Sequence, residues 1–121
     1  MAKITLSGQG AVTVNDELFQ MRSQWVADVS NVSEQTRDIN ATYLTLIQGG
    51  FVFIAIANLG AEDAVLRILC RTDYLRINIP AGGHVLLPGA GYVGSLDGEF
   101  LNPSIRTIAN TSRIKVIIGT A

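Results

Sequence analysis

The sequence predicts an all-β protein, folded as a single-domain antiparallel β-sandwich of jelly-roll or immunoglobulin-like type. Residues 51–88 contain three short apolar or alternating runs, at 51–57, 65–70 and 75–79, with turn-forming residues between them. Runs of this length between turns are typical of consecutive strands. Counted over the whole chain, about eight such strands and no convincing helical period favour a sandwich.

The chain has the length of one domain. Its 121 residues fall within the common range of about 100 to 150 for a domain, and such a chain can build its own core. We therefore predict one sandwich domain over residues 1–121, with residues 1–16 as a candidate extended arm. Short β-like pieces at residues 3–6 and 11–14 flank Gly8 and Gly10. They are compatible with a first hairpin or with an arm that adds to a neighbouring sheet.

Residues 17–29 show two competing periodicities. Helical spacing groups Leu18, Met21, Trp25 and Val29. Strand spacing instead puts apolar residues on one face and polar residues on the other, a cleaner partition. The first face would hold Phe19, Met21, Ser23, Trp25, Ala27 and Val29, and the second Gln20, Arg22, Gln24 and Asp28. We predict a strand.

The next segments are a loop and further strands. Residues 31–40 are polar and lack aromatic residues, which predicts a surface loop. Residues 42–47 resume β character, and Gly49-Gly50 marks a turn into the run at 51–57. This run does not alternate, so we expect both of its faces to be covered, either in the middle of the sandwich or at a subunit contact.

The last third of the chain predicts more strands and turns. Pro80 can open a tight turn in which a following glycine takes a positive φ, and residues 84–87 continue as a strand. Residues 89–103 form a long glycine-rich connection. Residues 105–109 and 113–118 flank the turn Asn110-Thr111-Ser112 and predict a hairpin.

Composition limits the classes of partner. A net charge of −1 excludes the electrostatic footprint of a dedicated nucleic-acid binder, so nucleic acid is not an expected partner. Charged residues make up 16% of the chain, against about 25% in typical soluble domains. This shortage of polar surface favours self-association, and we expect a homo-oligomer, a trimer or larger. No apolar run approaches the length of a membrane-spanning helix, so we expect a soluble protein made in a cytoplasm.

No residues predict an active site, a cofactor site or a metal site. Gly89-Ala90-Gly91-Tyr92-Val93-Gly94 fits a dinucleotide-binding fingerprint, but neither a helix nor an acidic residue about 20 positions later follows it. We interpret it as a flexible glycine loop. His84 is the only histidine, which leaves no second imidazole for a metal cluster or a catalytic triad. We predict a non-enzymatic protein without a cofactor.

The acidic residues and the cysteine have simple structural interpretations. Asp97 and Glu99 could form a carboxylate pair or bind calcium, but in a glycine-rich loop solvated acids are the better interpretation. Glu62 and Asp63 lie in a turn, where charge favours exposure. Cys70 cannot form a disulfide within the chain, and we expect a small buried hydrophobic residue there.

Five basic residues fall within predicted strands: Arg67, Arg76, Arg106, Arg113 and Lys115. If several share one sheet face, that face would form a positive stripe for an acidic protein surface or a phosphate backbone. The sequence gives no exposed aromatic residues between these charges, so a solvated face with cross-strand charge pairs is favoured.

The segment from Phe51 to the C-terminus resembles small structural proteins of tailed bacteriophage virions, nearest to capsid decoration, cement and head-fibre-base proteins. The resemblance rests on an apolar strand that ends in Asn58-Leu59-Gly60, on IPAGGHVLLPG and on IRTIANTSRIKVIIGTA. It implies a non-enzymatic, multimeric protein that binds a capsid or tail protein through edge strands and extended termini. Its location would be the virion, after synthesis in the host cytoplasm. The resemblance carries no site residues.

An alternative function belongs to a different class. A β-sandwich can serve as a recognition module for carbohydrate or for another cell-surface ligand, with aromatic rings as stacking platforms. The candidate platforms are Trp25, Tyr43, Tyr74, Tyr92 and Phe100.

Overall fold

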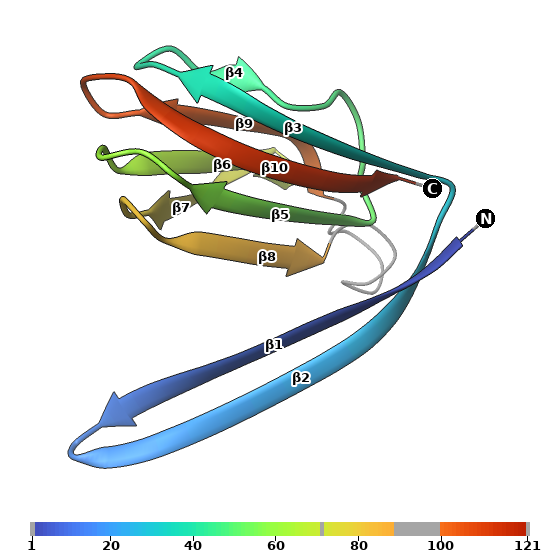
Figure 1. Cartoon of the computed structure of the whole chain (residues 1–121), viewed down its shortest axis with the longest axis vertical. Coiled ribbons are helices and arrows are strands. Elements are labelled where there is room, and N and C mark those ends of the chain that lie inside the picture. Colours follow the sequence, from blue (N-terminus) through green and yellow to red (C-terminus); the bar gives the residue numbers. More distant parts are fainter. Residues whose placement is uncertain (1, 71, 89–99, 121) are drawn as a thin grey trace.

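The computed structural model describes residues 2–70, 72–88 and 100–120. These residues form ten β-strands and no helix. Eight of the strands make two packed four-stranded antiparallel sheets, and the first two form a separate hairpin (Figure 1). The predicted all-β sandwich is therefore confirmed.

The strands belong to three sheets. Sheet I has the order β3-β10-β5-β8, sheet II has the order β4-β9-β6-β7, and the hairpin contains β1 and β2. In chain order the strands are β1 Ala2–Val14, β2 Glu17–Val29, β3 Asn31–Ile39, β4 Leu44–Thr45, β5 Phe53–Asn58, β6 Ala64–Cys70, β7 Asp73–Ile79, β8 His84–Pro88, β9 Phe100–Thr107 and β10 Ser112–Thr120.

The strands pair in a nested order. β6 pairs with β7, β5 with β8, β4 with β9 and β3 with β10, all antiparallel. The chain from β3 to β10 is thus one long two-stranded ribbon that wraps into two layers. Eight strands arranged in this way form a jelly-roll. Of the two predicted sandwich types, the structure is the jelly-roll.

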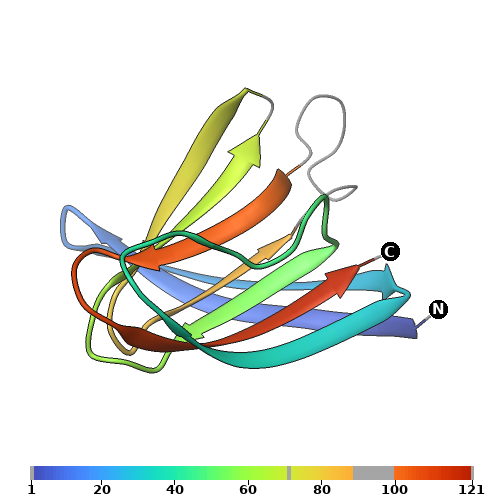
Figure 2. The ribbon, with the colours of Figure 1, turned by 90° about the horizontal axis from the view of Figure 1, so that it is seen from above.

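The core lies between the two layers, which Figure 2 shows from above. Ile54 and Ile56 of sheet I meet Leu66, Ile68 and Ile105 of sheet II, and all five are almost fully buried. Burying each such side chain stabilises the fold by about 1.5 to 3 kcal/mol. Because strand side chains alternate between faces, the residues between these core positions point outward, where they form two outer sheet faces.

The central strand predictions are confirmed. β5 lies between β10 and β8, with Phe53 buried on its outer face and Ile54 on its inner face. The turn after β7 follows the prediction for Pro80, because Gly83 N donates to Pro80 O at 2.8 Å and Gly82 has a φ of 77°. Gly49, before the central stretch, has a φ of 89°.

The predicted hairpin of residues 105–109 and 113–118 is wrong. β9 belongs to sheet II and β10 to sheet I, and residues 108–111 cross from one layer to the other. Ile105 and Ile114 are both fully buried in the same core, which they approach from opposite layers. A compact turn can join two layers as readily as two neighbours in one sheet, so the turn residues alone misled the prediction.

The predicted loop at residues 31–40 is also wrong, because residues 31–39 form the edge strand β3. Its backbone pairs with β10 from Asn31↔Thr120 to Ile39↔Ser112. Most of its side chains are exposed, and Ile39 is buried. An edge strand needs fewer apolar side chains than a central one, so a polar composition did not reveal it.

The predicted connection at residues 89–103 is wrong at its end, since Phe100 to Pro103 belong to β9. Residues 89–99, with the GAGYVG sequence, Asp97 and Glu99, lie outside the described residues. The pairing of β6 with β9 shifts register between Arg67 and Leu69, a β-bulge in β9 close to Pro103. A bulge accommodates a proline, which has no N–H to donate. The strand predicted at residues 42–47 is reduced to Leu44 and Thr45.

The hairpin of β1 and β2 is longer than the sequence suggested. Its register runs from Ala2↔Val29 to Val14↔Glu17. The pieces at residues 3–6 and 11–14 are therefore parts of one strand, whereas the strand predicted at residues 17–29 is confirmed. Asn15 and Asp16 have φ values of 51° and 66°. Two positive φ values in a two-residue loop define the type I′ turn, whose twist suits a hairpin.

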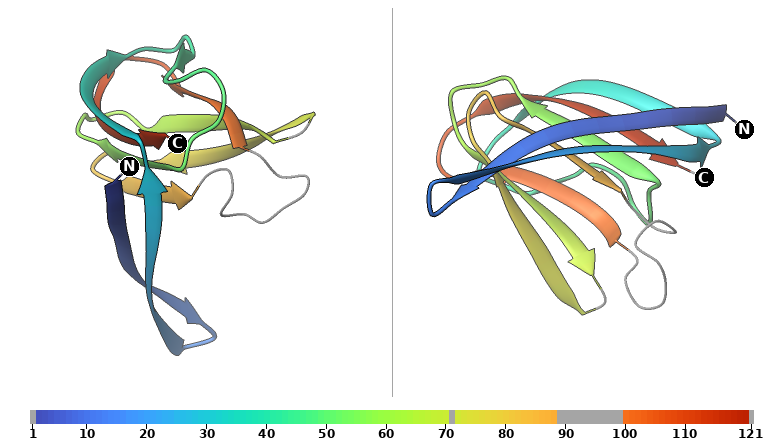
Figure 3. Two further views of the ribbon diagram at one scale, coloured as in Figure 1. Left: turned by 90° about the vertical axis from the view of Figure 1, so that its right-hand side faces the viewer. Right: turned by 90° about the horizontal axis from the view of Figure 1, so that it is seen from below.

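The hairpin extends away from both sheets (Figure 3). At its root, Ser30 N donates to Thr120 O at 2.8 Å. Val29 is 1% exposed and packs in a small cluster with Phe53 on the outer face of sheet I. The hairpin is therefore anchored at one end only.

Candidate functional site

The outer face of sheet II carries a row of cations and aromatic rings. Leu66 and Ile68 point into the core, so Arg67 between them points outward. The register places Arg67 opposite Arg76 of β7 and opposite Ser104 of β9. We call the five side chains of this face the arginine–tyrosine row: Arg106, Tyr43, Arg67, Tyr74 and Arg76.

The members of the row alternate in space. Arg67 Cζ lies 3.9 Å from the ring centroid of Tyr43 and 4.6 Å from that of Tyr74. Arg106 Cζ lies 5.0 Å from the Tyr43 ring, and Arg76 Cζ lies 5.7 Å from the Tyr74 ring. Cation–π attraction acts within about 6 Å of a ring centroid. The two rings therefore separate three like charges and hold the middle guanidinium between them.

The described residues around the row provide no compensating negative charge. Among the described residues, no carboxylate lies within 4.0 Å of its three arginines, whereas on sheet I Arg113 pairs with Asp38 at 3.1 Å and Lys115 with Glu34 at 2.8 Å. The prediction of cross-strand ion pairs is thus confirmed for Arg113 and Lys115. For Arg67, Arg76 and Arg106 the alternative holds, with a shared face and aromatic rings between the charges.

Two atoms of the row are unusual. The Nε groups of Arg67 and Arg106 are shielded from solvent, and neither has a hydrogen-bond partner among the described residues. A buried donor without a partner costs about 1 to 3 kcal/mol. Like charges directly opposite each other on paired strands, as Arg67 and Arg76 are, also destabilise a sheet. An anion placed over the row would relieve the repulsion between these like charges.

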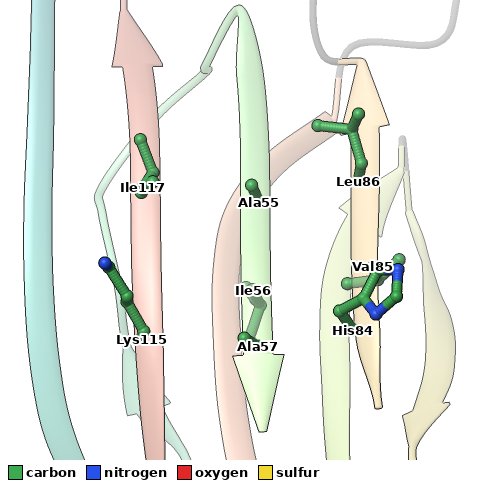
Figure 4. A pocket seen from close by; sticks show the side chains of 8 residues that line it. All are labelled: Ala55, Ile56, Ala57, His84, Val85, Leu86, Lys115 and Ile117. Atoms are coloured by element: carbon green, nitrogen blue, oxygen red, sulfur yellow. The ribbon is translucent and has the colours of Figure 1, made fainter. Parts of the chain in front are cut away.

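The outer face of sheet I has a different chemistry, an apolar groove (Figure 4). Its floor is Ala55 and Ala57 of β5, and Leu86 of β8 and Ile117 of β10 form its walls. In the register, Leu86 and Ile117 both lie opposite Ala55, so two large side chains flank a small one. Ile56, Val85, His84 and Lys115 complete the lining, which is almost entirely apolar.

The groove continues toward the root of the hairpin. Leu86 and Ile117 also pack against the buried pair Phe53 and Val29, together with Val52. One apolar surface therefore runs from the last residue of β2 across the middle of sheet I.

The other candidate residues from the sequence do not come together at one site. His84 is exposed, and Cys70 is half-buried at the end of β6, less buried than predicted. Glu62 accepts a hydrogen bond from Asn110, and Asp63 accepts one from the backbone N–H of Ala81. Within residues 2–70, 72–88 and 100–120, no three His, Cys, Asp or Glu side chains gather in a way that could hold a metal ion.

Three of the aromatic residues proposed as stacking platforms already contact other side chains of the chain. Arginines lie over the rings of Tyr43 and Tyr74, and Phe100 is half-buried against the core. The side chain of Trp25 and the whole of Tyr92 lie outside the described part of the chain. The sequence predicts the three arginines of the row as strand cations, but it does not place aromatic rings between them, because Tyr43 comes from a distant segment. The pair Asn15-Asp16, two residue types that tolerate the positive φ of a hairpin turn, is the signal in the sequence for the long hairpin.

Comparison of the chain with models of protein families, with curated proteins and with solved structures finds no match. No helix capable of crossing a membrane occurs among the described residues.

Proposed function

We propose that this chain is a non-enzymatic structural subunit of a bacteriophage virion, which self-associates as a trimer or larger and binds a capsid or other shell surface, stabilising or decorating it. One observation carries the proposal. The β1–β2 hairpin pairs only with itself in the described structure, and an apolar groove begins at its root.

The hairpin is suited to reach a neighbouring subunit. Each of its strands has 13 residues, which corresponds to about 40 Å at 3.3 Å per residue. A two-stranded hairpin on its own is marginally stable in water. Leu18 and Val26 are both well over half exposed on it. Packing against another molecule would stabilise the hairpin and cover these side chains.

Both edges of the hairpin are also open in the described structure. An open edge presents unpaired N–H and C=O groups, to which a strand of another molecule can add. Strand addition joins subunits through main-chain hydrogen bonds and needs no particular side chains at the edge. The low share of charged residues in the chain separately favours self-association.

The apolar groove supplies a second contact surface. Its small residues, Ala55 and Ala57, leave room between Leu86 and Ile117 for side chains of a neighbour. Extended apolar surface on an outer sheet face is typical of a protein–protein contact. Because the groove is continuous with the hairpin root, one partner could cover both.

The jelly-roll fold is compatible with the proposed structural role and also with carbohydrate binding. Jelly-rolls occur in viral capsid proteins and in lectins, and a fold alone does not establish a function. The surroundings of the tyrosine rings distinguish an assembly protein from a carbohydrate-binding module here. Arginines lie over Tyr43 and Tyr74, so these rings are poorly placed to stack on a sugar. The observation favours assembly over carbohydrate recognition.

The test is the mass of the full chain in solution, measured by size-exclusion chromatography with light scattering. We expect three or more chains per particle. Ala55→Arg puts a charge in the apolar groove and should shift the protein to smaller species. The matched control is Ile108→Arg, because Ile108 is 61% exposed on the connection between the two layers, and the mass should not change.

Shell binding is tested separately, by negative-stain imaging of virions assembled with and without the chain. We expect extra density on the shell only when the chain is present. A protein that is monomeric in light scattering and leaves the virion image unchanged would contradict the proposal.

A further inference from the structure

We infer that the arginine–tyrosine row on sheet II binds carboxylates of an acidic protein surface. This inference deepens the proposed function, on which it rests, by naming the chemistry of the shell partner. It also assigns the two outer faces to different tasks. Sheet I and the hairpin would contact other copies of the chain, and sheet II would contact the partner protein.

The arrangement of the row pre-organises its central cation. Arg67 Cζ lies within 4.6 Å of two ring centroids, from residues that are 31 positions apart in the chain, Tyr43 and Tyr74. Both rings restrict where the guanidinium can lie. Arginine presents a rigid fork of donors that matches a carboxylate, and a fork that is already held in place loses less freedom when it binds.

The charges of the row are not neutralised within the described structure. Within the described residues, none of its three arginines has a carboxylate within 4.0 Å. The ion pairs described on the sandwich lie on sheet I instead, where they join basic residues of β10 to acids of β3. Arg67 and Arg76 lie directly opposite each other on paired strands. An anion placed over the row would reduce this repulsion, and positive patches meet negative ones across interfaces.

The Nε groups of Arg67 and Arg106 are a second unusual feature of the row. Two neighbouring arginines, Arg67 and Arg106, each keep a shielded N–H that has no partner within residues 2–70, 72–88 and 100–120. Native structures rarely leave such donors unsatisfied, and those that occur call for an explanation such as a ligand or a functional role. Both side chains are half-buried, so a partner that accepts hydrogen bonds here gains interactions in a partly desolvated site.

Carboxylates fit this row better than a nucleic acid does. A single strand would need free ring faces for its bases to stack on, and arginines already lie over both rings. The net charge of −1 also gives no general attraction for a long polyanion. A short row of three cations matches a cluster of Asp and Glu side chains.

The experiment is isothermal titration calorimetry of the full chain with poly-L-glutamate, alongside poly(dT) at the same charge concentration. We expect poly-L-glutamate to bind, more weakly as salt is added, and more tightly than poly(dT). Arg67→Lys keeps the charge but loses the fork, and should weaken binding about tenfold. Arg76→Lys should also weaken it. Arg37→Lys, an exposed change on β3 of sheet I, is the matched control and should bind like the unchanged protein.

Three results would overturn the inference: no binding of poly-L-glutamate, tighter binding of poly(dT), or unchanged binding by both Arg67→Lys and Arg76→Lys. Arg76 is exposed, so its variant keeps the test valid even if Arg67→Lys does not fold. Light scattering on the same samples separates this inference from the proposed function. If the protein is an oligomer that does not bind poly-L-glutamate, only this inference is contradicted. If it is a monomer that binds poly-L-glutamate, only the proposed self-association is contradicted.

Discussion

Ser112 donates a buried hydrogen bond of 2.8 Å to Oδ1 of Asn58, and this contact links the start of β10 to the end of β5. Asn58 is 1% exposed and uses its other groups as well. Its Nδ2 donates to the carbonyl oxygens of Glu62 and Ile79, at 2.7 and 3.1 Å, and its Oδ1 also accepts from Gly60 N at 3.2 Å. Because Ile79 ends β7, one side chain joins sheet I to sheet II.

We predict that Asn58→Ala lowers the free energy of unfolding by about 2 to 4 kcal/mol, since it leaves several buried polar groups without partners. Urea denaturation followed by circular dichroism measures the change. Asn78→Ala, at an exposed position on β7, is the control and should cost less than about 0.5 kcal/mol. Equal losses for the two variants would show that the Asn58 network does not stabilise the fold.

A second prediction concerns Gly119, beside the root of the hairpin. A Cβ at this position would meet the ring of Phe53 and lie 3.0 Å from Cγ1 of Val29. We expect Gly119→Ala to destabilise the protein by about 1 to 3 kcal/mol through overpacking. In the double variant with Phe53→Leu, the smaller side chain gives room, so the combined loss should be less than the sum of the single losses. Additive losses, measured by urea denaturation, would mean that the two residues do not interfere.

The sequence predicted strands well where burial imposes a pattern. In β7, Ile77 and Ile79 alternate with Arg76 and Asn78 because one side of the strand faces the core and the other faces solvent. The edge strand β3 has little buried surface, so its polar residues carry no such signal. The exchange of layers between β9 and β10 depends on pairing across the whole ribbon, which no local window contains.

The arginine–tyrosine row could be predicted only in part. The sequence predicts Arg67, Arg76 and Arg106 as strand cations, because the patterns of their strands are clear. Tyr43 and Tyr74 come beside Arg67 only through the nested pairs β4–β9 and β6–β7. The rings between the charges are therefore a product of the topology. The apolar groove has the same origin, since Ala55, Leu86 and Ile117 belong to three strands that the jelly-roll brings together.

A third prediction tests the core. Leu66 is fully buried between the sheets, and Leu75 on the neighbouring strand is 39% exposed. We expect Leu66→Ala to lower the free energy of unfolding by about 2 to 5 kcal/mol, because it removes buried apolar surface and leaves a cavity. Leu75→Ala should cost clearly less. A larger loss at Leu75 than at Leu66 would be incompatible with the described burial.

The last prediction concerns what holds the edge strand β3 in place. The ion pair between Lys115 and Glu34 measures 2.8 Å, but its side chains are 45% and 59% exposed. Exposed ion pairs contribute about 0 to 1 kcal/mol, and salt screens them. Ile39, at the end of the same strand, is 3% exposed within the core. The apolar anchor and the backbone pairing with β10 should therefore dominate over the charges.

We accordingly expect Glu34→Gln to lower the free energy of unfolding by less than about 1 kcal/mol, and Ile39→Ala to lower it by about 2 to 5 kcal/mol. Urea denaturation at low and high salt measures both. Added salt should reduce the small effect of Glu34→Gln and leave that of Ile39→Ala nearly unchanged, because only the first is electrostatic. If Glu34→Gln proved the more damaging change, the ion pairs, and not burial, would be what attaches β3 to the sandwich.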